Sequence, residues 1–120
     1  MKIRLKKKKK ETYQILKKQL IKVLEKKFNK KNIIVAYEPI WSIGTGKIPN
    51  QKDLLKTVTY IKKVLKNIFK AGSVPVLYGG SVDDRNIHLF KQITELDGFL
   101  IGGASKSSKK FIDIIKKYYR

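Results

Sequence analysis

Three short apolar runs, separated by segments of helical periodicity, constrain the fold of this chain more than any other feature. The runs cover residues 33–37, 74–78 and 98–101, and Gly, Pro or polar residues bound each of them. Continuous apolar runs of this length are typical of parallel strands that are covered on both faces. Strands that alternate with helices form right-handed βαβ units. The pattern therefore predicts an α/β fold with about three parallel strands and flanking helices.

Four segments have the apolar spacing of amphipathic helices. The first covers residues 11–29, the second runs from an N-cap at Asn50 to about Lys70, and the third covers residues 84–93. The last begins at a cap provided by Ser107 or Ser108. Its apolar positions are expected to point inward, and they are Phe111, Ile112, Ile115 and Tyr119.

The chain is strongly basic, with 120 residues and a formal net charge of +20. A continuous lysine block, Lys6 to Lys10, predicts that residues 1–10 form a disordered arm and that residues 11–120 form the folded domain. The other lysines are spread over helix faces, and arginine, the usual reader of base edges, is scarce. Contact with nucleic acid should therefore be salt-sensitive and blind to sequence. A basic nucleic-acid-binding module is kept as an alternative, but no specific nucleic acid is expected.

Composition also bounds the other partners. The absence of cysteine excludes a disulfide framework, and a single histidine, His88, cannot form a histidine metal cluster. No apolar stretch approaches the roughly 20 residues of a membrane span, so no membrane is expected and the cytoplasm is the expected location. His88 falls inside a predicted helix, away from any strand end, and is interpreted as a surface or packing residue.

A single carboxylate follows the first apolar run. Glu38 stands at the end of the predicted strand, and Pro39, Trp41, Gly44 and Gly46 follow it. Functional groups of parallel α/β folds lie at the carboxyl ends of the strands. A base followed by a loop with a stiff start and a mobile tip fits this arrangement. The alternative is a surface glutamate followed by an ordinary loop.

Glycine pairs follow the other two runs. Gly79-Gly80 precedes Ser81, and Gly102-Gly103 follows the third run. Such turns let backbone N–H groups approach an anion closely, and a helix that starts there adds its dipole. Either pair alone is a common turn.

Three segments, in this order, resemble triosephosphate isomerase. They are Tyr37-Glu38-Pro39-Ile40-Trp41-Ser42-Ile43-Gly44-Thr45-Gly46-Lys47, Tyr78-Gly79-Gly80-Ser81-Val82, and Asp97-Gly98-Phe99-Leu100-Ile101-Gly102-Gly103-Ala104-Ser105. The resemblance covers about Lys31 to Arg120. It implies a partial (β/α)8 TIM barrel, because a whole barrel takes roughly 250 residues.

The resemblance also implies the roles of individual residues. Glu38 would be the general base that moves a proton between C1 and C2 of a triose phosphate, in glycolysis and gluconeogenesis, without metal or cofactor. The substrate phosphate would be bound by Gly44, Ser81, Gly102 and Gly103, and Leu100 would line the wall beside the base. The lid would consist of Pro39, Ile40, Trp41, Ile43, Thr45, Gly46 and Lys47.

The family's electrophiles, a lysine after the first strand and a histidine after the fourth, belong to segments with no counterpart in this chain. The chain is therefore expected to be a fragment that carries the base, the lid and the phosphate loops but is inactive alone. The alternatives are a catalytically inert half barrel and one half of a split enzyme, which would join a complementary N-terminal half or form a homo-oligomer.

Overall fold

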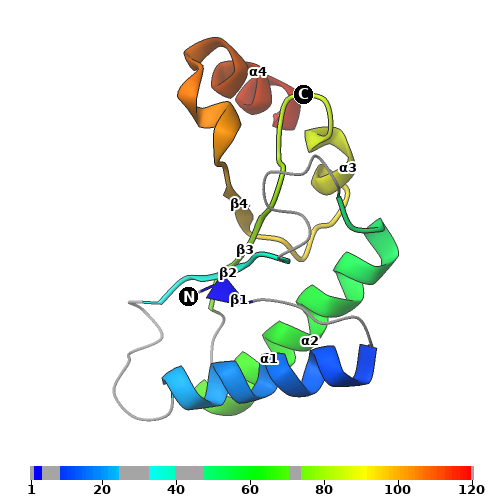
Figure 1. Ribbon diagram of the computed structural model, residues 1–120, viewed down its shortest axis with the longest axis vertical. Helices are drawn as coiled ribbons and strands as arrows, with labels where there is room; N and C mark the ends of the chain where they lie inside the picture. The colour runs from blue at the N-terminus through cyan, green and yellow to red at the C-terminus, as the bar shows by residue number, and fades with distance from the viewer. Residues whose placement is uncertain (1, 4–8, 25–32, 40–47, 71–73, 120) are drawn as a thin grey trace.

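A parallel sheet of four strands forms the centre of the computed structural model, which describes residues 2–3, 9–24, 33–39, 48–70 and 74–119 (Figure 1). The spatial order is β1-β2-β3-β4, the same as the order along the chain. The strands are β1 (Lys2–Ile3), β2 (Val35–Tyr37), β3 (Val76–Gly79) and β4 (Gly98–Leu100). The three parallel strands that the apolar runs predict are thus confirmed as β2, β3 and β4.

The shortest strand, β1, lies where the sequence predicted a disordered arm. Lys2 pairs with Ala36, and Ile3 pairs with Tyr37, along the edge of β2. The first helix already begins at Lys9. Residues 1 and 4–8 lie outside the described part, so the boundary between an arm and a folded domain near residue 10 stays a prediction. The physical reason for β1 is that strand pairing uses backbone groups, which the charge of nearby side chains does not remove.

The helices connect the strands and fall into two groups. Helix α1 (Lys9–Leu24) lies beside α2 (Gln51–Phe69), with the rings of Tyr13 and Tyr60 stacked at a centroid distance of 4.5 Å. At the other end of the molecule lie α3 (Ile87–Lys91), the 3-10 helix η3 (Gly103–Lys106) and α4 (Ser108–Tyr118) (Figure 1).

Helix α2 forms as its sequence predicts. The Asn50 side chain accepts a hydrogen bond from the Lys52 N–H at 2.8 Å, which caps the helix start. Lys70 ends the helix in the left-handed conformation, with φ 65°. One side of the helix is buried, and its residues are Leu54, Thr57, Val58, Ile61, Val64 and Leu65. Although α2 has 19 residues, no helix within the described ranges is both long and apolar enough to cross a membrane.

A ladder of aromatic rings fills the space between the sheet and the C-terminal helices. The Tyr78 ring is tilted against Tyr37 at 6.3 Å and is stacked on Phe90 of α3 at 4.8 Å. Phe90 in turn meets Phe99 of β4, which contacts Tyr118 of α4 edge-on. Side chains alternate across a strand, so Tyr37, Tyr78 and Phe99, which pair with one another in register, share the helix-covered face of the sheet.

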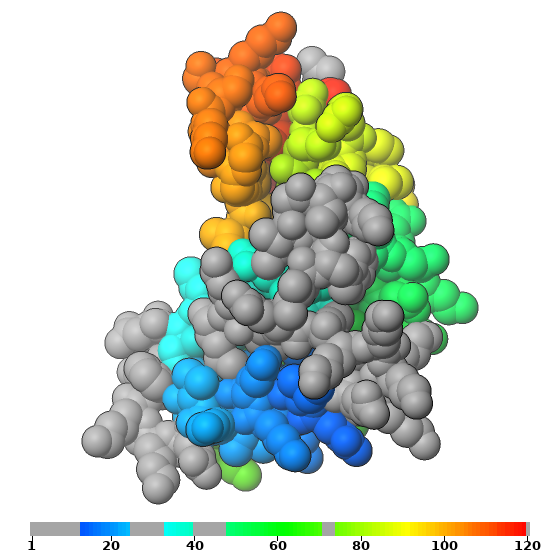
Figure 2. Space-filling model, in the orientation of Figure 1, coloured from blue at the N-terminus to red at the C-terminus, as the bar shows by residue number. Residues whose placement is uncertain are grey.

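The apolar stripe of α4 is oriented differently from the sequence prediction. Ser107 caps the helix as predicted, by accepting from the Lys110 N–H at 3.3 Å. The prediction that the apolar stripe points inward is wrong, because Phe111, Ile112, Ile115 and Tyr119 are exposed and Ile114 is the buried residue of the helix. Figure 2 shows α4, in orange to red, at one end of the molecule, far from α1 in blue. In the part that the structure describes, α4 packs through the side that carries Ile114 and Tyr118.

Candidate functional site

Glu38 directly follows β2 and faces away from the helices. Tyr37, the last residue of β2, points to the helix-covered face, so alternation directs Glu38 to the opposite face. The residue is 7% exposed, which is unusual for a carboxylate. Pro39, which follows it, is also buried. The end of β2 therefore holds one carboxylate in a nearly enclosed position.

Gly79 at the end of β3 provides the space that the Glu38 side chain occupies. A methyl group at Gly79 would lie 2.8 Å from Glu38 Cγ, 2.9 Å from Glu38 Oε1 and 3.2 Å from Leu100 Cβ. Gly79 pairs with Leu100 in the register of β3 and β4. The ends of three neighbouring strands thus meet at one position. The carboxylate follows β2, the glycine backbone that it packs against belongs to β3, and Leu100 of β4 forms an apolar wall.

The phenol of Tyr37 lies next to Glu38 in sequence but on the other face of the strand. Burial raises the pKa of this phenol far above its ordinary value, and the nearby Tyr78 and Tyr13 add to the shift. The Tyr37 hydroxyl therefore stays protonated at neutral pH. This buried hydroxyl and its ring contribute to the packing of the core.

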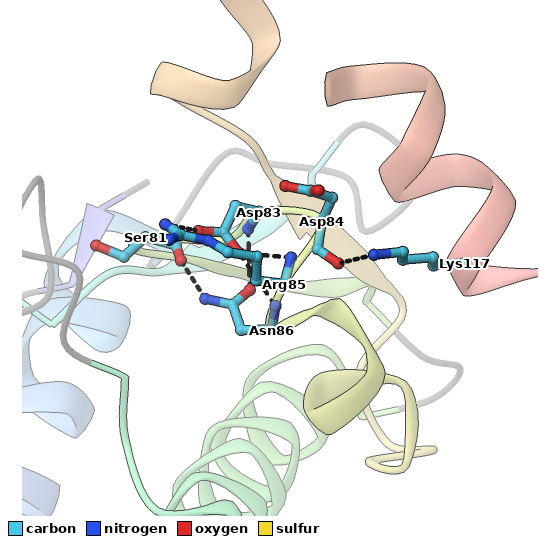
Figure 3. A network of polar contacts seen from close by, with 6 residues as sticks. All are labelled: Ser81, Asp83, Asp84, Arg85, Asn86 and Lys117. Carbon is cyan, nitrogen blue, oxygen red and sulfur yellow. Dashed lines mark hydrogen bonds and ion pairs between the residues drawn. The ribbon is translucent and has the colours of Figure 1, made fainter. Parts of the chain in front are cut away.

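The loop after β3 has an unusual backbone. Gly80 has φ 138° and Ser81 has φ 49°, so both residues are in the left-handed half of conformational space. The side chain of Asn86 donates a hydrogen bond to the Ser81 carbonyl at 2.6 Å (Figure 3). Lys117 of α4 reaches the next part of the loop and donates to the Asp84 carbonyl at 3.0 Å.

The turn after β4 is open to solvent. Gly102 has φ −90° and ψ −102°, and η3 begins immediately after it. Both the N–H and the hydroxyl of Ser105 donate to the Gly102 carbonyl, at 3.0 and 2.5 Å. A methyl group at Gly102 or Gly103 would meet nothing within 4 Å. The turn therefore presents its backbone to an unobstructed space at the end of β4.

Parallel strands end at the same edge of a sheet, and four of the predicted site residues follow these ends. Glu38 follows β2, Ser81 follows β3, and Gly102 and Gly103 follow β4. Gly44 lies outside the described residues. So does most of the predicted lid: Ile40, Trp41, Ile43, Thr45, Gly46 and Lys47. His88 is exposed on α3, as the sequence suggested.

Two contacts near this edge were missed from the sequence. The contact of Gly79 with Glu38 depends on strand register, although each residue comes directly after one of the paired tyrosines, Tyr37 and Tyr78. The Asn86 contact could have been suspected from an asparagine five positions after Ser81, at the start of a helix. Among the described residues, no group of three His, Cys, Asp or Glu side chains could hold a metal ion.

A buried carboxylate at the carboxyl end of one parallel strand, with glycine turns at the same ends of the next two strands, is the arrangement of a parallel α/β fold with its functional groups at one edge of the sheet. The sequence model of triosephosphate isomerase matches residues 3–118. The chain therefore belongs to the triosephosphate isomerase family.

Individual relatives agree with this assignment. The chain is 41% identical to triosephosphate isomerase of Chlamydia abortus over 92 residues, which cover 74% of this chain and 36% of that protein. It is 40% identical to the enzyme of Dehalococcoides mccartyi strain BAV1 over 110 residues, or 89% of this chain and 43% of the relative. It is 37% identical to triosephosphate isomerase of Mycoplasma genitalium over 91 residues, which cover 73% of this chain and 37% of that protein. The chain thus spans about two fifths of the length of these relatives.

Proposed function

We propose that this chain provides the proton-transferring carboxylate and the phosphate-binding turns of a triosephosphate isomerase. Glu38 would take a proton from one carbon of dihydroxyacetone phosphate and return it to the next, which yields glyceraldehyde 3-phosphate for glycolysis or gluconeogenesis. The observation that supports this role is the position of the carboxylate, enclosed at a strand end between Gly79 and Leu100. A general base needs a fixed position relative to the carbon that it deprotonates.

The phosphate of the substrate would bind at the turns after β3 and β4. Ser81 would contribute its N–H and hydroxyl, and Gly102 and Gly103 would contribute backbone N–H groups. The open space at the glycine turn and the left-handed backbone at Ser81 support this assignment. Gly44 of the proposed lid would add a further N–H, and closure of residues 39–47 would exclude water from the enediolate.

The partner of this chain would be the remaining part of the barrel. Strands β1 and β4 are the edges of the described sheet, and an edge strand presents backbone groups that can pair with another strand. The exposed apolar side of α4 would be covered in the same assembly. We place this assembly in the cytoplasm, where triose phosphates are processed.

The test is an isomerase assay of the purified chain, alone and mixed with the N-terminal segment of the Dehalococcoides relative that precedes the matched region. The chain alone should be at least about 10²-fold slower than the full-length relative, because each missing electrostatic group costs about 10²–10³ in turnover. The mixture should recover activity, and Glu38→Gln should abolish it. Glu95→Gln is the matched control, since Glu95 follows α3 away from the strand ends.

The outcomes separate the hypotheses. Recovery that requires Glu38 supports a split isomerase. A complex that forms but stays inactive supports the inert half barrel. Activity of the chain alone that Glu38→Gln abolishes would contradict the need for a complementary half, and activity that is insensitive to Glu38→Gln would contradict the role of this carboxylate.

A further inference from the structure

The carboxamide of Asn86 holds the loop after β3 at two points. Its Nδ2 donates to the Ser81 carbonyl at 2.6 Å, and its Oδ1 accepts from the Asp83 N–H at 2.9 Å. Both bonds are partly buried, and between the two points lies Val82, which is buried. We call this pair of hydrogen bonds the Asn86 clamp; Figure 3 shows it.

The clamp does not serve the helix that Asn86 precedes. Asn86 occupies the N-cap position of α3, yet its side chain makes no capping hydrogen bond. Asp83 holds the turn before the helix, because its Oδ1 accepts from the N–H groups of Arg85 and Asn86 at 2.9 and 3.0 Å. The Asn86 carboxamide is therefore directed back toward the strand end rather than forward into the helix.

The residue that the clamp holds has a backbone conformation that needs support. Ser81 has φ 49°, which is unfavourable for a residue with a Cβ atom. A left-handed residue after a glycine turns its N–H away from the direction that an extended strand would give it. In Figure 3 the Ser81 hydroxyl lies on the side of the residue remote from Asn86. Holding the Ser81 carbonyl on one side thus fixes which groups Ser81 presents on the other.

We propose that Asn86 is a positioning residue of the anion site, because its clamp keeps Ser81 in the left-handed conformation in which the N–H and hydroxyl can meet a phosphate. The proposal rests on the proposed function, which assigns the phosphate to Ser81, Gly102 and Gly103. It adds a residue that does not touch the substrate and acts only through the backbone of Ser81. A binding group held in place before the ligand arrives avoids the ordering cost at binding.

The chain contains a matched control for this clamp. Gln51, at the start of α2, donates from its Nε2 to the Leu89 carbonyl of α3, also at 2.6 Å and also partly buried. Asn86→Ala and Gln51→Ala therefore remove the same kind of bond, a side-chain amide to a backbone carbonyl, from the two ends of one short segment. Both should lower stability, but only Asn86→Ala should affect Ser81.

The experiment is a titration of the full chain with inorganic phosphate. Binding is monitored through the ¹⁵N and ¹H chemical shifts of the Ser81, Gly102 and Gly103 amides. Asn86→Ala should raise the phosphate Kd about five-fold, the effect of losing one or two ordinary hydrogen bonds. Gln51→Ala should leave the Kd within about two-fold of the wild type. An equal loss in both variants would show that Asn86 acts only on stability and would overturn the proposal.

A second readout keeps this test separate from that of the phosphate site. Scalar couplings and Cα and Cβ shifts report whether φ of Ser81 is positive, with no ligand present. If phosphate does not shift these amides in the wild type, the phosphate assignment fails; loss of positive φ at Ser81 in Asn86→Ala alone would still establish the clamp. Positive φ retained in Asn86→Ala would overturn it. If Asn86→Ala does not fold, the same couplings are measured in Asn86→Asp, which keeps the acceptor for Asp83 and replaces the donor to Ser81 by a charged oxygen. Positive φ at Ser81 in that variant would also overturn the proposal.

Discussion

The two faces of the sheet use alternate residues of the same strands in different ways. On the helix-covered face, Tyr37 and Tyr78 are buried in an aromatic core that extends through Phe90. One residue further along each strand, Glu38 and Gly79 meet on the opposite face, beside the 42% exposed Leu100. A step of one residue therefore separates packing from the candidate site. Substitutions on the first face should cost stability, and substitutions on the second should change the position of one carboxylate.

The largest expected effect is the loss of Phe90 from the helix-covered face. Phe90 is 1% exposed and stacks on Tyr78. Phe90→Ala should lower the free energy of unfolding by about 3–5 kcal/mol, the usual cost of removing a buried aromatic ring and leaving a cavity. Urea unfolding followed by circular dichroism measures the change.

The comparison variant is Leu100→Ala on the opposite face. Because Leu100 is partly in solvent, its truncation should cost less than about 1 kcal/mol. Equal losses of unfolding free energy in Phe90→Ala and Leu100→Ala would show that both faces of the sheet contribute equally to the core.

A smaller effect is expected where the two strand ends meet. Gly79→Ala should cost about 1–3 kcal/mol, because the new methyl group would lie 2.8 Å from Glu38 Cγ and must displace that side chain. Glu38→Ala removes both the Cγ and the Oε1 that the methyl group would meet. The cost of Gly79→Ala should therefore fall by about 1 kcal/mol in the Glu38→Ala background, a coupling that a double-mutant cycle measures. Strictly additive losses would mean that Gly79 does not determine the position of Glu38.

The last effect concerns the ionisation of Tyr37 at alkaline pH. An unfolded tyrosine has a pKa of about 10, and burial in the native state raises the pKa of Tyr37 above that value. Below about pH 10 both states are protonated, and the stabilisation is fully present. Above it, only the unfolded state releases the proton, so this phenol lowers the free energy of unfolding by up to about 1.4 kcal/mol per pH unit.

Tyr37→Phe should therefore show a shallower loss of stability than the wild type between pH 9 and 11, measured as urea midpoints. Tyr119→Phe, which changes an exposed hydroxyl, is the control and should follow the wild type. Parallel curves for Tyr37→Phe and the wild type would contradict a buried, protonated phenol.

Much of this fold could be predicted from local sequence, but the orientation of α4 and the presence of β1 could not. Apolar runs located β2, β3 and β4, and Asn50 and Ser107 located the starts of α2 and α4. The periodicity of α4 predicted an apolar stripe, yet periodicity does not say which element covers a stripe, and here Ile114 alone is buried. Strand β1 escaped notice because a strand of two residues leaves no periodic signal.

The candidate site divides in the same way. Glu38, Ser81, Gly102 and Gly103 could be selected because each follows an apolar run, and parallel strands end at one edge. The contact between Gly79 and Glu38 depends on the register of two strands, and the Asn86 clamp depends on the path of a loop. Sequence patterns specify neither the strand register nor the path of the loop. The roles of these residues in catalysis and phosphate binding stay predictions until the assays above are made.

The exposed side of α4 has a consequence for the colloidal behaviour of the chain. Phe111, Ile112 and Ile115 lie among exposed lysines at 109, 110, 116 and 117. Two copies that approach through these apolar side chains bring like charges together, and the net charge of +20 adds repulsion over longer distances. The Debye length is about 8 Å at physiological ionic strength and about 3 Å in 1 M salt. Added salt or a polyanion therefore removes the barrier that keeps the chains dispersed and favours their clustering.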